Sequence, residues 1–260
     1  MKRTLIKPNI SEFPIEFHSL IANADVYDSS CSPEARVWFI DKGEGYYLKT
    51  AQKGNLCKEA ELTAYFNKKG LGATVLEYAS KDTDWLLTSR VRGEDCTYSQ
   101  YLEDPKRLCD LLAELLRSLH EIDPCDCPVD RTAEYFAGAE SNYKAGMFDP
   151  SYAYKGDIFK TADDAWRVIE SGKHLLQSDT LIHGDYCLPN IMLDNWKFSG
   201  FIDLGNGGRG DRHIDIFWGA WTLEFNLKTD KYRERFFDAY GRDRVDVEAL
   251  RVVGAAETFG

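Results

Sequence analysis

The sequence lacks a long hydrophobic run, an apolar leader and an excess of basic residues. None of its 260 residues lies in an apolar stretch near the roughly 18 residues of a membrane span, and the start, MKRTLIKPNI, has no secretory signal pattern. The 32 lysines and arginines are outnumbered by 43 aspartates and glutamates, a net charge of −11. We therefore expect neither a membrane nor a nucleic-acid partner, since phosphate-backbone binding needs a basic surface. A cationic small molecule suits this balance, although solubility alone explains it equally well.

Paired cysteines are also scarce. The chain has seven cysteines, an odd number, and the close pair Cys125 and Cys127 has neither a zinc-site nor a redox-motif spacing. We expect reduced thiols in a cytoplasmic protein. The 43% hydrophobic content is that of an ordinary globular chain, long enough for one large or two small domains.

The residues that carry chemistry are concentrated in 181–215, which begins LIHGDYCLPNIML and continues through FSGFIDLG. Asn190 follows Asp185 by five positions, and Asp203 comes at the end of a second apolar run. Phosphoryl transfer from a nucleotide uses such a set, because one carboxylate accepts the proton of the attacking hydroxyl while an amide and a second carboxylate hold Mg²⁺. The pattern predicts Asp185 as the catalytic base and Asn190 and Asp203 as magnesium ligands.

HGDYCLPN together with FSGFIDLG resembles the aminoglycoside 3′-phosphotransferases (kanamycin kinases), a branch of the protein-kinase-like fold. The resemblance implies an α+β, two-lobed fold. A small antiparallel-sheet N-lobe, residues 1–91, would bind the nucleotide. A larger, mainly helical C-lobe, residues 92–260, would be catalytic and bind substrate, with a helical insertion at about 130–178. The implied reaction is ATP-dependent transfer of the γ-phosphoryl group to a hydroxyl, the 3′ one, of an antibiotic such as kanamycin or neomycin, which confers resistance.

The first hundred residues have the pattern of a sheet. Val37–Ile40 and Tyr46–Lys49 predict a hairpin closed by residues 41–45, after a strand over Val26–Ser32. No G-x-G-x-x-G occurs here. The segment CSPEARV is instead similar to the serine-bearing loop of the aminoglycoside kinases, and this likeness makes Ser32 a candidate phosphate contact; a plain hairpin loop is the alternative.

Lys49 ends an alternating run on the second strand of this hairpin. The resemblance implies that it contacts the nucleotide phosphates and pairs with a glutamate on the following helix, KEAELTAYFNKKG. Glu59 and Glu61 compete for that pairing. We favour Glu59, because Leu62 and Phe66 follow it by three and seven positions on the inward face.

Two more strand-like runs, Ala73–Tyr78 and Trp85–Val91, lead into Arg92-Gly93. By the resemblance, LLTSRVRG is the hinge between the lobes, where backbone groups bind adenine. The backbones of Ser89 and Val91 are the candidates, for ATP or GTP.

The remainder has helical periodicity. His120, at the end of a leucine-rich helix that begins at Asp104-Pro105, is expected to be a structural hydrogen-bonding residue, and Asp215 a loop-anchoring acid. The run GNGGRGDR lacks the G-K-[ST] of a phosphate-binding P-loop and is expected to be a short loop. Helices are predicted as two patterns within 130–178 and as 216–225, 230–240 and 247–259.

The resemblance places antibiotic contacts in the insertion and at the C-terminus, in addition to Asp185. The candidate residues are Asp157, Glu224, Glu257 and Gly260, with Glu140 and Asp149 as further acids of the insertion. Taken singly, the insertion acids Glu140, Asp149 and Asp157 are better explained as solvated surface groups. Tyr152, Tyr154 and Lys155 stand where a denser acidic cluster is expected, so a macrolide, choline or a sugar stays open as the acceptor.

A peptide substrate and a phosphorylation switch are not expected, because Gly184 replaces the arginine of H-R-D and no A-P-E element follows Asp203. A non-catalytic nucleotide-binding protein, a pseudokinase, is the third alternative. The presence of Lys49, Asp185, Asn190 and Asp203 together disfavours it. The expected partners are a nucleotide, Mg²⁺ and a cationic antibiotic, bound by a monomer or weak dimer.

Overall fold

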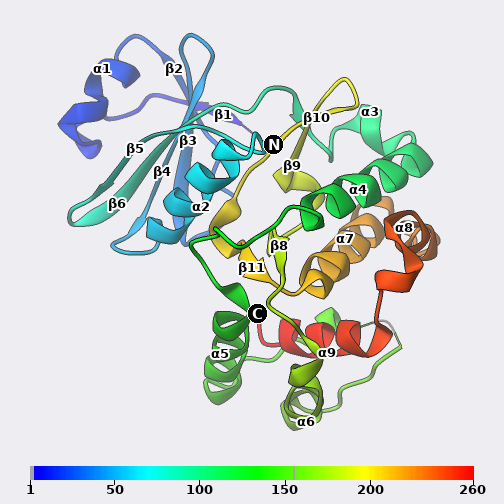
Figure 1. Cartoon of the computed structure of the whole chain (residues 1–260). Coiled ribbons are helices and arrows are strands. Elements are labelled where there is room, and N and C mark those ends of the chain that lie inside the picture. The colour runs from blue at the N-terminus through cyan, green and yellow to red at the C-terminus, as the bar shows by residue number, and fades with distance from the viewer. Residues whose placement is uncertain (1–2, 155) are drawn as a thin grey trace. The chain divides into compact units, whose positions relative to one another are not determined.

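The computed structural model describes residues 3–154 and 156–260, and Lys155 lies outside them. The chain forms two compact units. We call the part up to Asp95 together with Pro189–Gly205 the sheet unit, and Cys96–Leu188 with Asn206–Gly260 the helical unit. Figure 1 shows the antiparallel sheet of the first and the mainly helical second unit, which confirms the predicted α+β fold.

This division differs from the boundary predicted at residue 91. The short strand β7 (Glu94–Asp95) pairs with β9 (Ile191–Asp194), which in turn pairs with β10 (Lys197–Phe201). Phe201 also donates its backbone N–H to Leu71 at 2.7 Å. Because of these hydrogen bonds, the hairpin that carries Asp203 belongs to the sheet unit.

The main sheet has the strand order β1-β2-β3-β4-β6-β5, with every neighbouring pair antiparallel. The predicted hairpin is confirmed as β3 and β4, with Trp38 opposite Leu48, and glycines at positive φ in its turn. The strands are β1 (Thr4–Ile6), β2 (Asp25–Asp28), β3 (Ala35–Asp41), β4 (Tyr46–Gln52), β5 (Val75–Ser80) and β6 (Thr83–Ser89).

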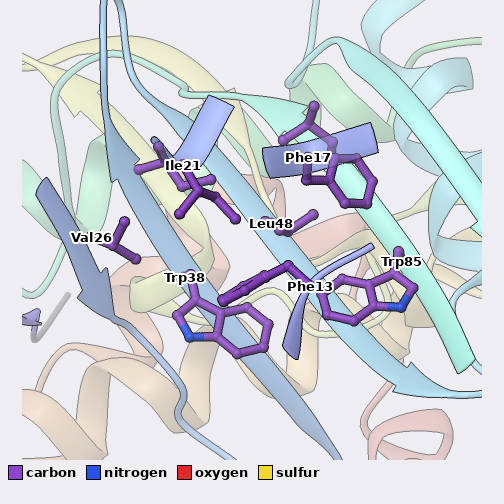
Figure 2. Close-up of a cluster of buried hydrophobic side chains, with 9 residues drawn as sticks. Phe13, Phe17, Ile21, Val26, Trp38, Leu48 and Trp85 are labelled. Carbon is purple, nitrogen blue, oxygen red and sulfur yellow. The ribbon is translucent and has the colours of Figure 1, made fainter. Parts of the chain in front are cut away.

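One face of this sheet is covered by residues 10–21, which form the short helices η1 (Ile10–Glu12), η2 (Ile15–Phe17) and α1 (His18–Ile21). Figure 2 shows how Phe13 and Phe17 point toward Trp38 and Trp85, whose rings stack at 5.9 Å. None of these three helices is predicted from the sequence, because each is too short to show a helical period. The other face holds α2 (Cys57–Lys68), whose buried residues include Leu62 and Phe66.

The helical unit contains the capped helices that the sequence predicts. Asp104 accepts the N–H of Arg107 at the start of α4, and Thr161 and Asp164 form a capping box on α6. Its helices are α3 (Ser99–Leu102), α4 (Pro105–His120), α5 (Arg131–Lys144), η3 (Pro150–Tyr152), α6 (Ala162–Gly172), η4 (Lys173–Leu175), η6 (Leu204–Asn206, shared with the sheet unit), α7 (Arg212–Leu227), α8 (Arg233–Tyr240), η7 (Arg242–Arg244) and α9 (Val247–Glu257).

The glycine-rich run GNGGRGDR is not simply a loop. Gly208–Gly210 form β11, which pairs with β8 (Thr180–Ile182) directly before His183. A Cβ on Gly208, whose φ is 136°, would lie 2.8 Å from the backbone oxygen of Val129, so glycine is favoured at the start of this strand. Within the described part of the chain, no helix is both long and apolar enough to cross a membrane.

Candidate active site

A lysine between two carboxylates is the main ionic feature of the sheet unit. The Nζ atom of Lys49, on β4, lies 2.7 Å from Oε2 of Glu59 on α2 and 3.0 Å from Oδ1 of Asp203 after β10. Burial disfavours the charged ammonium, but the two carboxylates outweigh it and raise the pKa of Lys49. Glu61 points to solvent, so Glu59 is the residue of α2 that pairs with Lys49.

Asn190 and Asp203 stand at the same end of the β9–β10 hairpin. The carbonyl of Asn190 accepts the N–H of Ile202 at 3.0 Å, and Asp203 follows with a left-handed φ of 59°. An amide oxygen and a carboxylate suit Mg²⁺, which proteins hold through one or two such groups plus substrate phosphates. No group of three or more histidine, cysteine, aspartate or glutamate side chains forms a metal site among the residues described. Water and nucleotide phosphates are the further ligands that Mg²⁺ takes at such sites.

The loop that carries Asp185 in the helical unit is held by one buried acid, Asp215 of α7. Its carboxylate accepts the backbone N–H of His183 and of Gly184, each at 2.7 Å. Gly184 has a φ of 80°, and a Cβ there would lie 1.8 Å from the carbonyl oxygen of Asn206. Only glycine fits this turn, so the residue before Asp185 is determined by backbone geometry.

Asp215 is itself fully buried and is hydrogen-bonded by His120, which in turn contacts Tyr240. Nε2 of His120 lies 3.2 Å from Asp215, and Nδ1 of His120 lies 2.8 Å from the hydroxyl of Tyr240. Burial lowers the pKa of His120, so the ring is neutral. A neutral ring satisfies both contacts when Nε2–H donates to Asp215 and Nδ1 accepts from Tyr240. His120 and Asp215 thus have the structural positions expected of them.

The residues after Asp185 are also anchored. Tyr186 donates its hydroxyl to the carbonyl of Leu112, and the N–H of Leu188 is accepted by Oγ1 of Thr222 on α7 at 3.1 Å. Burial, with Asp185 nearby, raises the pKa of the Cys187 thiol well above its usual value. A thiol that stays protonated is a poor nucleophile. All seven cysteines are free thiols.

Glu257, at the end of α9, is a carboxyl group that is 9% exposed. It accepts the hydroxyl of Tyr135 at 2.8 Å and the indole N–H of Trp218 at 3.1 Å. Burial is the main cause that raises the pKa of Glu257 to about 7; the charge of Asp185 adds to this, whereas the two hydrogen bonds and Arg131 oppose it. Glu257 therefore changes charge near neutral pH.

The other acids predicted for the antibiotic site have partners of their own. Arg251 donates to Asp157 at 3.0 Å, and Arg233 donates to Glu224 at 2.7 Å. The carbonyl of Gly260 accepts from Asn142 at 3.3 Å. Of the two further candidates, Glu140 pairs with Lys144 on α5, and Asp149 accepts the N–H of Ser151 at the start of η3. Their roles as substrate contacts stay predictions.

The residues predicted to bind the nucleotide differ in exposure. Ser32 is exposed and hydrogen-bonds with Glu34, which lowers the pKa of that glutamate. Ser89 exchanges hydrogen bonds with Thr74 at 2.9 Å, through its backbone N–H and its Oγ. Val91 is buried in an apolar cluster with Ala73 and Met192, against which Ile202 packs. These three roles also stay predictions.

Comparison with known proteins identifies the family. Residues 32–251 match the model of the phosphotransferase enzyme family. A probable aminoglycoside 3′-phosphotransferase of Lactococcus lactis subsp. lactis (strain IL1403) is 53% identical over 98% of each chain. An aminoglycoside 3′-phosphotransferase of Streptomyces fradiae is 31% identical over 79% of this chain and 80% of its own. The chain belongs to the aminoglycoside 3′-phosphotransferase family. The predicted family and enzyme class are thereby confirmed.

Solved structures agree on the fold. A crystal structure of an aminoglycoside-3′-phosphotransferase of type VIII matches with a TM-score of 0.77 over 96% of each chain, at 24% identity. A ternary complex of the aminoglycoside phosphotransferase APH(4)-Ia with AMP-PNP and hygromycin B matches with a TM-score of 0.70 over 93% of this chain and 86% of its own, at 15% identity. The kinase-like fold predicted from the sequence is that of these structures.

Some residues near the family motifs are absent from the sequence-based predictions. Tyr47 stands two positions before Lys49 and so shares its face of β4, and Phe39 lies opposite Tyr47 with ring centres 5.2 Å apart. Arg3 donates to the Tyr47 hydroxyl at 2.6 Å and stacks 3.9 Å above Phe39. The alternation of the strand could have indicated Tyr47. The Tyr135 and Trp218 contacts of Glu257 have no such local signal.

The buried carboxyl of Glu257 makes stability depend on pH. Because its folded pKa of about 7 exceeds the usual 4.5, the folded state binds a proton that the unfolded chain releases. This contribution to stability is complete below about pH 4.5 and is lost as the pH rises through 7, by roughly 3 kcal/mol. Urea unfolding of the wild type and Glu257→Gln between pH 5 and 8 measures it. As the pH rises, we expect the wild type to lose stability relative to the glutamine variant. A difference in unfolding free energy that does not change with pH would contradict this assignment.

Proposed function

We propose that the chain transfers the γ-phosphoryl group of ATP to the 3′-hydroxyl of an aminoglycoside such as kanamycin or neomycin, and so confers resistance to it. The observation that carries the proposal is that other side chains hold the proposed catalytic groups in defined positions. Lys49 is fixed by Glu59 and Asp203, and Asp215 holds the loop in front of Asp185 by two hydrogen bonds. The similarity to the Lactococcus and Streptomyces proteins supports the acceptor class.

The sheet unit supplies the groups for the nucleotide. In this proposal Lys49 contacts the phosphates as a permanent cation, and Asn190 with Asp203 would hold Mg²⁺. Mg²⁺ bound there neutralises the charge on the phosphates. Ser32 is the candidate contact of the phosphate-facing loop. The buried side chain of Val91 and the neighbouring Met192 provide an apolar surface suited to a purine base, beside the backbone of Ser89.

The helical unit supplies the base. The acceptor hydroxyl oxygen bonds to the γ-phosphorus, the bond from that phosphorus to the β–γ bridging oxygen breaks, and ADP leaves. The hydroxyl proton passes to the carboxylate of Asp185. Since phosphoryl transfer needs little covalent help, positioning is the main contribution of these residues. The proposed contacts for ammonium groups of the acceptor are Glu257, Glu224, Asp157 and Gly260.

A different alcohol as acceptor is the second candidate. The observation that favours it is the pairing of Asp157 with Arg251 and of Glu224 with Arg233, which neutralises two of the acids proposed for the antibiotic. A macrolide, choline or a sugar would need fewer carboxylates than an aminoglycoside with several ammonium groups.

ADP release separates these candidates. We expect release from MgATP to depend on kanamycin or neomycin, with a product heavier by one phosphoryl group and modified at the 3′ position by NMR. Macrolides, choline and simple sugars should give only background rates. Release with one of those acceptors alone would assign the second candidate. Nucleotide binding without turnover of any acceptor would assign a pseudokinase. GTP in place of ATP tests the base preference.

The pairing of Lys49 with Glu59 can be tested on α2. Glu59→Gln removes one of the two carboxylates that position the ammonium, so we expect kcat/KM for ATP to fall roughly 10- to 100-fold, the size of a hydrogen bond to a charged group. Glu61→Gln, two positions away and exposed, is the matched control and should leave kcat/KM unchanged. Equal effects of the two substitutions would show that Glu59 has no special role.

A further inference from the structure

Four aromatic side chains of the helical unit form one continuous group. Trp218, Trp221 and Phe225 follow each other along one side of α7, and Tyr152 reaches them from η3. The Trp221 and Phe225 rings stack at 4.8 Å, Trp218 meets Trp221 edge-on at 5.3 Å, and Tyr152 stacks on Trp221 at 5.8 Å. We call these four residues the aromatic row. From Trp218 to Phe225 it extends about 10 Å along the helix.

The aromatic row begins beside the loop of the proposed catalytic base. Trp218 donates its indole N–H to Glu257, whose pKa is raised in part by the charge of Asp185. Thr222, on the same helix, accepts the N–H of Leu188, three positions after Asp185. Because α7 carries both contacts, the helix that bears the row is attached to Glu257 and to the segment that follows Asp185. Figure 1 shows α7 and α9 next to each other in this unit.

The far end of the row is exposed and already binds a cation. The Phe225 side chain is 54% exposed and continues the group formed by Trp218, Trp221 and Tyr152 to the surface. The ammonium of Lys228 lies 4.3 Å from the centre of that ring. This lysine is exposed, so its flexible side chain can leave the ring at little cost. The row is thus a surface that accepts an alkylammonium group over an aromatic face.

We propose that the aromatic row is a specificity-determining platform, on which a ring of a cationic amino sugar stacks with an ammonium group over Phe225 in place of Lys228. The inference rests on the proposed function. Sugar and cyclitol rings have an apolar C–H face that packs on aromatic rings, and their ammonium groups are attracted to the ring face.

The charges around the row favour this occupant over a protein partner. The protein carries a net charge of −11, and the carboxyl of Glu257 lies at the inner end of the row. Arg233 lines a pocket with Trp221, but its charge is balanced by Glu224. Asp157 and Glu224 are neutralised by arginines, so carboxylates supply less of the cation binding than their number implies. An aromatic platform adds to the binding of the cationic acceptor without burying a further charge.

The test uses steady-state kinetics of the full chain with kanamycin at saturating MgATP. Phe225→Ala should raise the KM for kanamycin roughly 2- to 5-fold, with kcat and the KM for ATP unchanged. Trp221→Ala removes the ring on which Phe225 stacks and should raise the KM by a similar factor. Phe225→Leu keeps an apolar side chain without a ring and should behave like Phe225→Ala, whereas Phe225→Tyr should restore the wild-type KM. Tyr98→Ala, which removes an equally exposed ring elsewhere, is the control.

Lys228→Gln should act in the opposite direction. Because it removes the cation that covers Phe225, we expect the KM for kanamycin to fall roughly 2- to 5-fold. Lys231→Gln removes a nearby charge that lies over a different ring, Tyr232, and should change the KM less. An equal fall in both variants would assign the effect to net charge and overturn the role of the row.

The failure of this inference is distinct from that of the proposed function. If the wild type does not phosphorylate any aminoglycoside, both are overturned. If it does, and Phe225→Ala and Trp221→Ala leave the KM unchanged, the proposed function stands and the platform is wrong. A changed oligomeric state of Phe225→Ala with an unchanged KM, measured by light scattering, would assign the row to contact with a second copy instead.

Discussion

Asp185→Asn should lower kcat by at least about 100-fold, with the fold and the KM for ATP unchanged. The asparagine has the same shape but does not accept the proton of the acceptor hydroxyl. The backbone of the loop should stay in place, because Asp215 binds the N–H groups of His183 and Gly184 rather than the Asp185 side chain. The measurement is single-turnover transfer from MgATP to kanamycin, with ATP affinity determined separately.

The matched control for Asp185→Asn is Asp194→Asn, an exposed acid at the end of β9 that should leave kcat unchanged. A circular dichroism spectrum and urea midpoint equal to those of the wild type would show that the loss is chemical. Turnover within a few-fold of the wild type would remove Asp185 from the role of base.

Asp215→Ala has the largest expected effect on the fold. The substitution leaves three donors without their acceptor: the buried backbone N–H of His183, the part-buried N–H of Gly184, and the buried Nε2–H of His120. Each such donor costs about 1–3 kcal/mol, so we expect a loss of roughly 3–5 kcal/mol in the free energy of unfolding. Urea unfolding measures this loss. Activity should fall further than the unfolded fraction explains, because the loop before Asp185 loses its anchor.

A graded control comes from the outer end of the same network. Tyr240→Phe removes only the hydroxyl that hydrogen-bonds with His120 and should cost about 1 kcal/mol with kcat nearly unchanged. Asp215→Asn keeps one acceptor oxygen and should fall between the two variants. If Asp215→Ala were as stable as Tyr240→Phe, the anchoring role of this carboxylate would be disproved.

Elements with a clear period or cap are predictable from the sequence alone. The hairpin of β3 and β4 joins two strand-like apolar runs through a glycine-containing turn, α4 begins at an Asp-Pro cap, and α6 begins at a capping box, so each depends on residues close in the chain. The helices that cover the sheet between residues 10 and 21 and the strand β11 have no such local signal. They exist because tertiary contacts, such as Phe13 against Trp38, stabilise them.

The surroundings of the acids proposed to contact the substrate could not be predicted from the sequence either. The sequence predicts that acids at positions 157, 224 and 257 face a cationic acceptor, but it does not show which arginines lie near them. The structure pairs Asp157 with Arg251 and Glu224 with Arg233, whereas Glu257 is surrounded by neutral donors. The three carboxylates therefore differ in their partners: two are paired with arginines, and Glu257 is hydrogen-bonded by neutral groups.

The sequence by itself determined the family and the reaction class, because the residues proposed for proton acceptance and metal binding lie close together in 181–215 and their spacing is typical of the family. Only the tertiary structure decided how those residues are held and what surrounds the acceptor. The anchoring of the loop on Asp215, the shifted pKa of Glu257 and the aromatic row on α7 all join residues far apart in the chain. The packing of distant segments sets how far each side chain is buried and which side chains it contacts, and no local sequence pattern encodes either.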